Sequence, residues 1–187
     1  PSPPAMNRQL AALGIRTVAI VDPAIRADQE HPLYREGDAV RAFVTKADGT
    51  GYYVGEVWPG KSVYPDFTKA AAIAWWGPQY RILTDLGISG FWNDMNEPSD
   101  FSGSGTIPDH VRFDNFGLGA DHYQVHNAYG LAMARASRAG IEALQPDRRV
   151  FLLSRAGYSG VQEAAFIWSG DNTADWPHIR MNMTMAI

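Results

Sequence analysis

Apolar and polar positions along the chain repeat in a rhythm of a helix followed by a strand. The segment 4–14 places Met6, Leu10 and Leu13 on one helical face and ends at Gly14, and the apolar run 17–21 is typical of a strand buried on both faces. Further strands are expected within 88–98, 148–157 and 164–172, with helices between them. Helices that alternate with nearly continuous apolar strands predict parallel βα units. The pattern therefore predicts an α/β fold of about four such units.

A charged residue follows each of the four apolar runs. These residues are Asp22, Asp94, Arg155 and Asp171. The carboxyl ends of parallel strands form the edge at which α/β folds, and barrels above all, assemble their active sites. We therefore expect the four side chains to lie on one rim.

Two segments interrupt the rhythm. Residues 26–68 alternate around a turn at 47–51, which predicts a β-hairpin inserted after the first strand, and residues 102–121 form a second long, glycine-rich loop. Long insertions at βα loops usually carry function. We expect one partial barrel domain over 1–187, with the insertion 26–68 inside it.

Composition narrows the possible functions by exclusion. The 187 residues carry a net charge of -4, which argues against a nucleic-acid partner. No apolar run approaches the roughly 18 residues needed to span a bilayer, and residues 1–10 lack the apolar core of a signal peptide, so no membrane partner is expected and the compartment stays open. Because the chain has no cysteine, it has no disulfide, thiolate nucleophile or cysteine-based zinc site.

The acidic residues at strand ends suit the cleavage of a glycosidic bond. This reaction needs one carboxyl group that attacks or stabilises the sugar cation and another that donates a proton to the leaving oxygen. Aromatic rings that could stack on sugars flank them, at Trp58, Trp92, Trp168 and Trp176. The structural alternative for Asp94 is a helix cap or a loop ion pair, and for Asp171 it is a cap of the helix expected near Thr173. A third hypothesis for these aspartates is a magnesium-dependent, phosphatase-like site. The aromatic residues around them argue against it.

Five motifs occur in an order that points to a family. They are "IVDPAI", "VWPGKSVYPDF", "WNDMNEPSDF", "SRAGYSG" and "WSGDN", and together they closely resemble glycoside hydrolase family 31, the α-glucosidase family, through nearly the whole chain. The resemblance implies part of a (β/α)8 TIM barrel. It also implies a retaining α-glucosidase that cleaves terminal α-linked glucose from oligosaccharides by double displacement.

The resemblance assigns a role to each matching position. Asp94 corresponds to the nucleophile and Asp171 to the general acid/base, while Glu97 is expected to orient its neighbours through hydrogen bonds. Substrate-binding positions are Arg155, Trp92, Met95, Trp168, Trp58, Asp22 and Ile20. No metal or organic cofactor is implied.

The resemblance leaves some alternatives open. A transglycosylase or glucan lyase of the same family would share the nucleophile, and a catalytically inactive relative could hold a carbohydrate in the same pocket. The family's remaining barrel strands and flanking β-domains are the expected partners besides the substrate. We therefore expect an internal fragment that is inactive, or nearly so, when isolated.

Three further expectations concern residues outside these roles. Asp100 is expected to face solvent or to cap a turn. His122 and His126 have the spacing of a helical zinc pair but lack a third ligand, so capping and packing are favoured. The methionines at 181, 183 and 185 are expected to fill a core.

Overall fold

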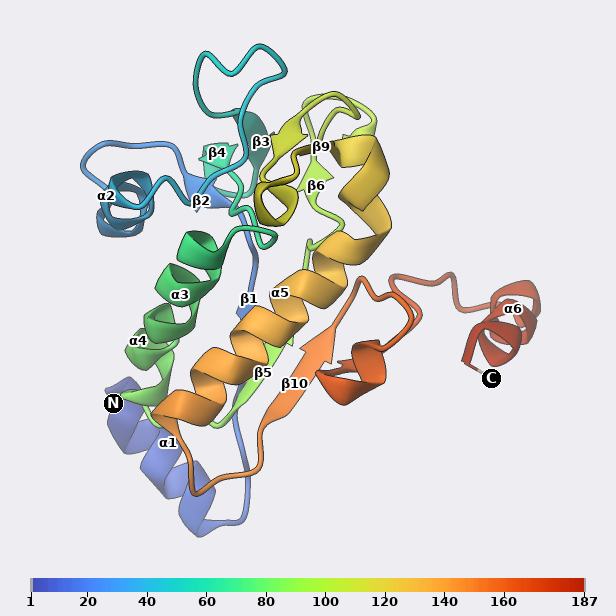
Figure 1. Cartoon of the computed structure of the whole chain (residues 1–187). Coiled ribbons are helices and arrows are strands. Elements are labelled where there is room, and N and C mark those ends of the chain that lie inside the picture. Colours follow the sequence, from blue (N-terminus) through green and yellow to red (C-terminus); the bar gives the residue numbers. More distant parts are fainter. Residues whose placement is uncertain (1, 187) are drawn as a thin grey trace.

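The computed structural model describes residues 2–186, and Figure 1 shows how its elements are arranged. In chain order they are α1 (Pro3–Ala12), β1 (Val18–Val21), β2 (Ile25–Arg26), α2 (Pro32–Ala39), β3 (Gly55–Val57), β4 (Gly60–Val63), α3 (Ala70–Gln79), α4 (Arg81–Thr84), β5 (Gly90–Asn93), β6 (Ser99–Asp100), β7 (Gly105–Thr106), β8 (Arg112–Phe113), the 3₁₀ turn η1 (Asn115–Gly117), β9 (Ala120–Asp121), α5 (His122–Leu144), β10 (Phe151–Ser154), the 3₁₀ turn η2 (Val161–Glu163), β11 (Phe166–Ile167) and α6 (Trp176–Ala186).

The central sheet has four parallel strands in the order β1-β5-β10-β11. The order of the four strands in the sheet is the same as their order along the chain, and helical segments lie in the connections between them. This is the arrangement of a stretch of a βα barrel. The register aligns Val21, Asn93 and Ser154 at the carboxyl ends of the first three strands. The predicted α/β fold with about four parallel units is confirmed.

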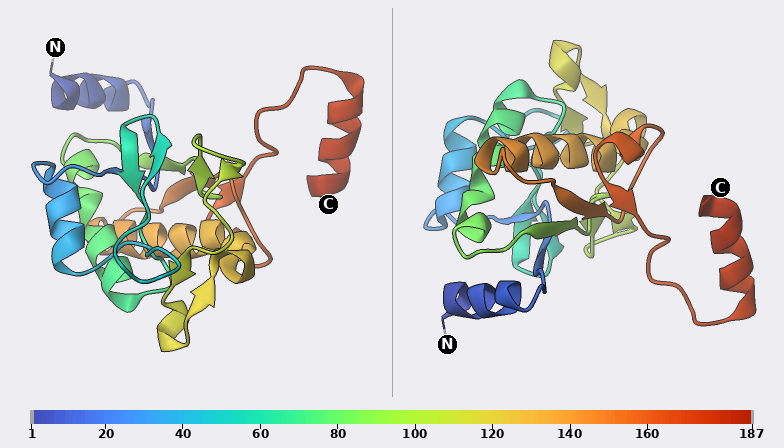
Figure 2. Two further views of the ribbon diagram at one scale, coloured as in Figure 1. Left: turned by 90° about the horizontal axis from the view of Figure 1, so that it is seen from above. Right: turned by 90° about the horizontal axis from the view of Figure 1, so that it is seen from below.

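One face of this sheet is covered and the other is open. Helix α5 runs along one face of the sheet (Figure 2). Phe91 is buried on the helical side, where it packs on Tyr80 of the α3–α4 segment, and its register partner Leu152 is buried with it. On the opposite face, Val18 is 49% exposed and Ile20 is 57% exposed. The expectation that the first strand is buried on both faces is wrong, because these four strands form an open sheet whose inner face is left uncovered by the elements that the structure describes.

Helices α3 and α5 approach so closely that only glycine fits between them. A Cβ atom on Gly140 would lie 2.3 Å from the Cα atom of Gly77. Beside this contact, Tyr80 donates a hydrogen bond to Ser137 and accepts one from the side chain of Asn93, both at 2.8 Å. Asn93 ends β5, so this buried network connects the helical layer to the strand that precedes Asp94.

The insertion after β1 forms a small antiparallel sheet, β2-β4-β3. The expected turn is present, since the Lys46 N–H bonds to the Gly51 carbonyl, but the flanking residues make only an isolated bridge between Thr45 and Tyr52. The regular hairpin is β3–β4 instead, and it turns at Trp58. Helix α2 also lies in this insertion and was not expected.

Helix α6 stands apart from the rest of the chain in Figures 1 and 2. Met181, Met183 and Met185 are 48%, 64% and 64% exposed. The expectation that these methionines fill a core is wrong for this structure, because α6 lies apart from the other elements of residues 2–186 and leaves them exposed. Within residues 2–186, no helix combines the length and apolar character needed to cross a membrane.

Candidate active site at the carboxyl end of the sheet

The charged residues that follow β1, β5 and β10 lie at one level of the sheet. The N–H of Asp94 bonds to the Val21 carbonyl at 3.2 Å, and the N–H of Arg155 bonds to the Asn93 carbonyl at 3.0 Å. The ladder therefore continues one residue past β5 and past β10. Because side chains alternate between faces, Asp94 and Arg155 belong to the open inner face. The expected shared rim is present for Asp22, Asp94 and Arg155.

Arg155 is the centre of the charged cluster. Its Nε donates to Glu97 Oε1 at 2.9 Å and its Nη2 donates to Glu97 Oε2 at 2.8 Å, which is the bidentate geometry that guanidinium groups favour. Its Nη1 lies 3.2 Å from Asp94 Oδ1, a buried atom that accepts no hydrogen bond, so this contact is an ion pair by distance alone. Hydrogen bonding to Glu97 raises the pKa of Arg155, and the charge of Asp94 adds to the effect.

Glu97 is held in its charged form by its neighbours. Burial raises the pKa of this carboxyl group, but the hydrogen bonds from Arg155 and from Ser99 outweigh burial and leave the pKa below its ordinary value. Ser99 Oγ donates to Glu97 Oε2 at 2.6 Å and accepts a hydrogen bond from Arg155 Nη2 at 2.8 Å. Glu97 therefore fixes the guanidinium group rather than facing open solvent.

The pKa of Asp22 is shifted upward, in the opposite direction to the pKa of Glu97. Burial raises its pKa, the negative charge of Asp94 raises it further, and Arg155 only partly offsets both. Its Oδ1 is buried and accepts no hydrogen bond. The site thus contains three carboxylates, of which Glu97 and Asp94 pair with Arg155 within 4 Å and Asp22 does not.

The loop after Asp94 is held in a strained conformation. Met95 has φ 55°, a left-handed geometry that costs a residue with a side chain of order 1–3 kcal/mol. Its side chain is 6% exposed, and its sulfur accepts a hydrogen bond from Arg155 at 3.1 Å. Asn96, fully buried, donates to Ser154 Oγ at 2.8 Å and accepts from the N–H of Ala156 at 2.9 Å.

Sequence reasoning missed the contributions of Asn96 and Ser99. Both lie inside the "WNDMNEPSDF" motif, and both are buried polar residues. Short polar residues next to a predicted catalytic carboxylate were the available signal, because a buried polar side chain needs a hydrogen-bond partner.

The predicted aromatic residues fall into two groups. Trp92 and Trp168 meet edge to face, with ring centroids 4.9 Å apart, and Trp92 lies on β5 two residues before Asp94. Trp58 is 72% exposed at the β3–β4 turn and packs against Phe101, with ring centroids 4.7 Å apart. Trp176 is 82% exposed on α6, the helix that stands apart, so it does not join either group.

Asp171 is the predicted residue that the structure holds least firmly. It is exposed, in the segment between β11 and α6. Its charge contributes a minor part of the raised pKa of Arg155, after the contributions of Glu97 and Asp94. The structure therefore brings Asp22, Asp94, Arg155 and Glu97 together and leaves Asp171 on an exposed segment at the same end of the sheet.

Two other expectations are settled by burial. Asp100 is 1% exposed and so does not face solvent, but its Oδ1 accepts a hydrogen bond from the N–H of Ser102, so the other expectation, that it caps a turn, is confirmed. His122 is fully buried and stacks on Phe113 with ring centroids 5.9 Å apart, in agreement with a packing role. Burial lowers the pKa of its imidazole to about 4. Within residues 2–186, no group of three or more potential His, Cys, Asp or Glu ligands is placed to hold a metal ion.

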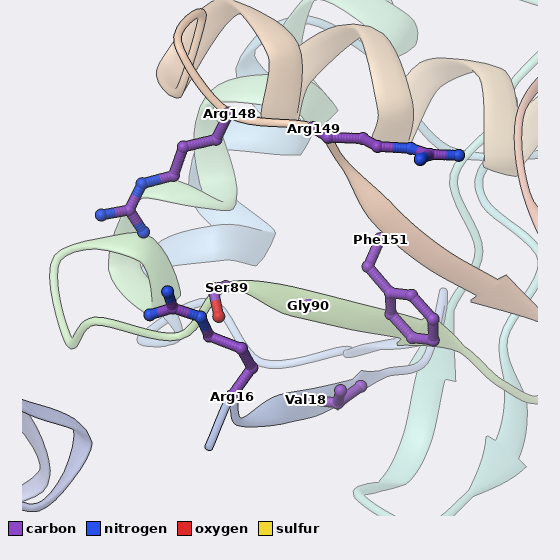
Figure 3. A pocket seen from close by; sticks show the side chains of 7 residues that line it. All are labelled: Arg16, Val18, Ser89, Gly90, Arg148, Arg149 and Phe151. Carbon is purple, nitrogen blue, oxygen red and sulfur yellow. The ribbon is translucent and has the colours of Figure 1, made fainter. Parts of the chain in front are cut away.

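A pocket at the other end of the sheet is unrelated to these carboxylates. Figure 3 shows it on the open inner face, where Val18 and Phe151 face each other across Gly90, and three arginines surround it. A Cβ atom on Gly90 would lie 2.9 Å from Val18 and 3.1 Å from Phe151. Because this hollow is at the amino ends of the strands, it is far from the edge where parallel sheets carry chemistry.

Comparison with known proteins connects this arrangement to a family. The chain is 45% identical over 174 residues to "Alpha-glucosidase 2" of Bacillus thermoamyloliquefaciens, covering 93% of this chain and 22% of the relative. It is 36% identical over 191 residues to human "Neutral alpha-glucosidase AB", covering all of this chain and 20% of the relative. The chain thus spans about a fifth of the length of these relatives.

Solved structures agree with the sequence relatives. A crystal structure of a glucosidase II alpha subunit in a Tris-bound state superposes with a TM-score of 0.85 at 33% identity, covering 95% of this chain and 20% of that one. A dextranase of Flavobacterium johnsoniae in complex with glucose gives a TM-score of 0.84 at 27% identity, covering 97% and 22%. The family described as "Glycosyl hydrolases family 31 TIM-barrel domain" matches residues 1–187. By its sequence motifs, its sheet and this match over the whole chain, the protein belongs to glycoside hydrolase family 31 and represents part of that family's TIM-barrel domain.

Proposed function

We propose that the rim of this sheet is part of the active site of a retaining α-glucosidase. Its substrate is a terminal α-linked glucose of an oligosaccharide. The observation that carries the proposal is the half-buried Asp94, held 3.2 Å from Arg155 at the end of β5, in a chain whose relatives are named α-glucosidases. A carboxylate that faces a fixed cation on the open face of the sheet has the placement that a nucleophile of this kind requires.

Asp94 attacks the anomeric carbon and forms a covalent glycosyl intermediate with inversion at that carbon. Asp171 first protonates the leaving oxygen and then removes a proton from the incoming water, whose attack inverts the carbon again and restores the α configuration. The exposed position of Asp171 supports this role in one respect, since a group that exchanges protons with water must reach it.

The remaining residues bind and orient. Arg155 receives its orientation from Glu97 and faces Asp94, so it can contact a sugar hydroxyl without leaving the cluster. Trp92 and Trp168 supply apolar surface beside the nucleophile, and Met95 closes the gap between Arg155 and the loop. Trp58, Ile20 and Asp22 complete the wall of the pocket.

We further propose that the activity requires a longer protein in which residues 1–187 are one segment. The open inner face supports this, since Val18, Ile20 and Phe151 are 43–57% exposed where a complete barrel packs its interior. The fraction of the relatives that the chain covers supports it as well. The isolated chain is then inactive or nearly so.

The test uses the full-length gene product and a panel of α-linked glucose disaccharides, with the product anomers followed by NMR. We expect α-glucose as the first product, no turnover by Asp94→Asn, and normal turnover by the matched control Asp147→Asn, an exposed aspartate between α5 and β10. β-Glucose as the first product refutes the retaining mechanism. Binding of glucosides without any cleavage would instead favour an inactive carbohydrate-binding relative.

A further inference from the structure

Asp100 is a buried carboxylate to which the proposed mechanism gives no task. Its four hydrogen-bond donors are all neutral groups. Oδ2 accepts from the hydroxyl of Tyr53 at 2.5 Å, while Oδ1 accepts from the N–H of Glu56 at 3.0 Å and from the N–H and hydroxyl of Ser102 at 2.8 and 2.6 Å. Burial raises its pKa, but these bonds outweigh burial and leave the pKa below its ordinary value. Asp100 is therefore ionised and fully bonded.

These bonds join two segments that are distant in sequence. Tyr53 and Glu56 belong to the insertion after β1, whereas Asp100 belongs to the loop that carries Asp94. The backbone makes the same junction, since the Phe101 N–H bonds to the Glu56 carbonyl at 2.8 Å. Tyr64, also from the insertion, donates to the Ser99 carbonyl at 3.1 Å.

Gly55 allows the two segments to come this close. A Cβ atom at this position would lie 2.3 Å from Asp100 Oδ2 and 2.7 Å from the Tyr64 hydroxyl. A side chain at this position would force the hairpin, the carboxylate of Asp100 or the Tyr64 hydroxyl to move. The absence of a side chain at Gly55 thus leaves room for the Asp100 carboxylate against the insertion, while Ser102 bonds to the same carboxylate from its own loop.

Asp100 stands between the exposed tryptophan and the charged cluster. Trp58, at the tip of the hairpin, packs on Phe101, the residue next to Asp100. On the other side, Ser99 bonds to both Glu97 and Arg155. Since Trp58 is 72% exposed, packing alone holds it weakly, and the polar bonds at the base of its hairpin must fix its position.

We propose that Asp100 and Tyr53 form a positioning pair that fixes Trp58 relative to Asp94 and thereby sets the affinity of the site for its sugar. The inference rests on the proposed function and adds to it the residues that determine the position of the Trp58 side chain in the pocket wall. Neither residue is assigned contact with the reacting atoms. Loss of the pair weakens substrate binding and leaves the chemical step largely intact.

The first experiment compares two neighbouring tyrosines in the full-length protein. Tyr53→Phe removes the hydroxyl that bonds to Asp100, and Tyr52→Phe removes one that bonds to Asp38 at 2.9 Å in the same insertion. We expect Tyr53→Phe to raise KM about tenfold, the order of one hydrogen bond to a charged group, with kcat changed less than about twofold. We expect Tyr52→Phe to change neither.

A double variant separates positioning from general destabilisation. If Tyr53 acts through Trp58, adding Tyr53→Phe to Trp58→Ala raises KM no further, whereas independent effects multiply. Asp66→Asn is a second control because Asp66 is 3% exposed and bonded by Thr68 and Asp114. It should lower the melting temperature without the change in KM. Multiplying effects, or an unchanged KM in Tyr53→Phe, overturn the proposal.

Hydrogen exchange tests the same pair without any turnover. We expect amides of residues 55–63 to exchange faster in Tyr53→Phe than in Tyr52→Phe, and equal rates would overturn the positioning role. If the wild-type protein cleaves no glucoside, the proposed function fails, while this measurement still decides whether Tyr53 and Asp100 hold the hairpin.

Discussion

Replacing Glu97 with glutamine tests whether a fixed guanidinium group is needed beside Asp94. Glu97 accepts two hydrogen bonds from Arg155 and one from Ser99, and the side chains of Arg155 and Glu97 are 19% and 32% exposed. A fully buried pair costs about 3–5 kcal/mol to break and an exposed pair about 0–1 kcal/mol. This half-buried pair lies between those limits, at about 2 kcal/mol. In Glu97→Gln the guanidinium group can turn onto Asp94 and compete with the sugar.

The assay is kcat on the preferred glucoside in the full-length protein. If the whole 2 kcal/mol is lost from the transition state, kcat falls about 30-fold. Glu163→Gln is the matched control, because Glu163 pairs with Arg135 at 3.5 Å and both side chains are more than half exposed. We expect this control to retain full activity. A Glu97→Gln protein with more than half of the wild-type kcat would refute the reasoning.

The same pair makes a prediction for pH. Because the pKa of Glu97 is lowered in the folded protein, the charged carboxylate contributes stability that is fully present above its unfolded pKa. That contribution is lost as the pH falls through the lowered pKa. Glu97→Gln should therefore show a smaller loss of stability on acidification below about pH 4.5 than the wild type does, as measured by urea unfolding.

Three further predictions concern stability, measured by urea unfolding. Because burial lowers the pKa of His122 to about 4, stability should fall by a few kcal/mol as pH drops from about 6.5 to 4, and His122→Phe should flatten that fall while His126→Phe should not. Gly140→Ala should destabilise the α3–α5 contact by about 1–3 kcal/mol, whereas Gly103→Ala, with nothing within 4 Å, should be neutral. Phe116→Gly should stabilise by about 1 kcal/mol, because Phe116 has φ 55° and is 73% exposed; no gain would contradict strain there.

The strands and the order of their terminal charges could be predicted because they depend on local pattern. Each mainly apolar strand is followed at once by Asp22, Asp94 or Arg155, which leaves little choice of register once the strands are parallel. The resemblance to a known family then supplied roles that periodicity does not contain. What each strand buries was not predictable in the same way, since the burial of Val18 and Ile20 depends on a layer outside these strands.

The insertion shows why the position of its hairpin and the burial of Asp100 could not be predicted from the sequence. Its hairpin was expected around the turn at 47–51, yet the regular ladder forms at Gly55–Val63, where the glycine permits contact with Asp100. The bonds from Ser102 are local, but the local sequence does not mark Asp100 as buried, because the other two donors, from Tyr53 and Glu56, are distant in sequence. Tertiary hydrogen bonding of this kind overrides the usual preference of aspartate for solvent.

The shared register of β1, β5 and β10 limits how such a site can vary in length. Val21, Asn93 and Ser154 are aligned, and the next residue in each strand is Asp22, Asp94 or Arg155. Deleting one residue inside any of these strands would turn its charged residue toward the helices. Length variation is therefore confined to the loops, where the insertion 26–68 and the segment 102–121 already lie. A deletion scan should show this as three short intolerant windows separated by long permissive ones.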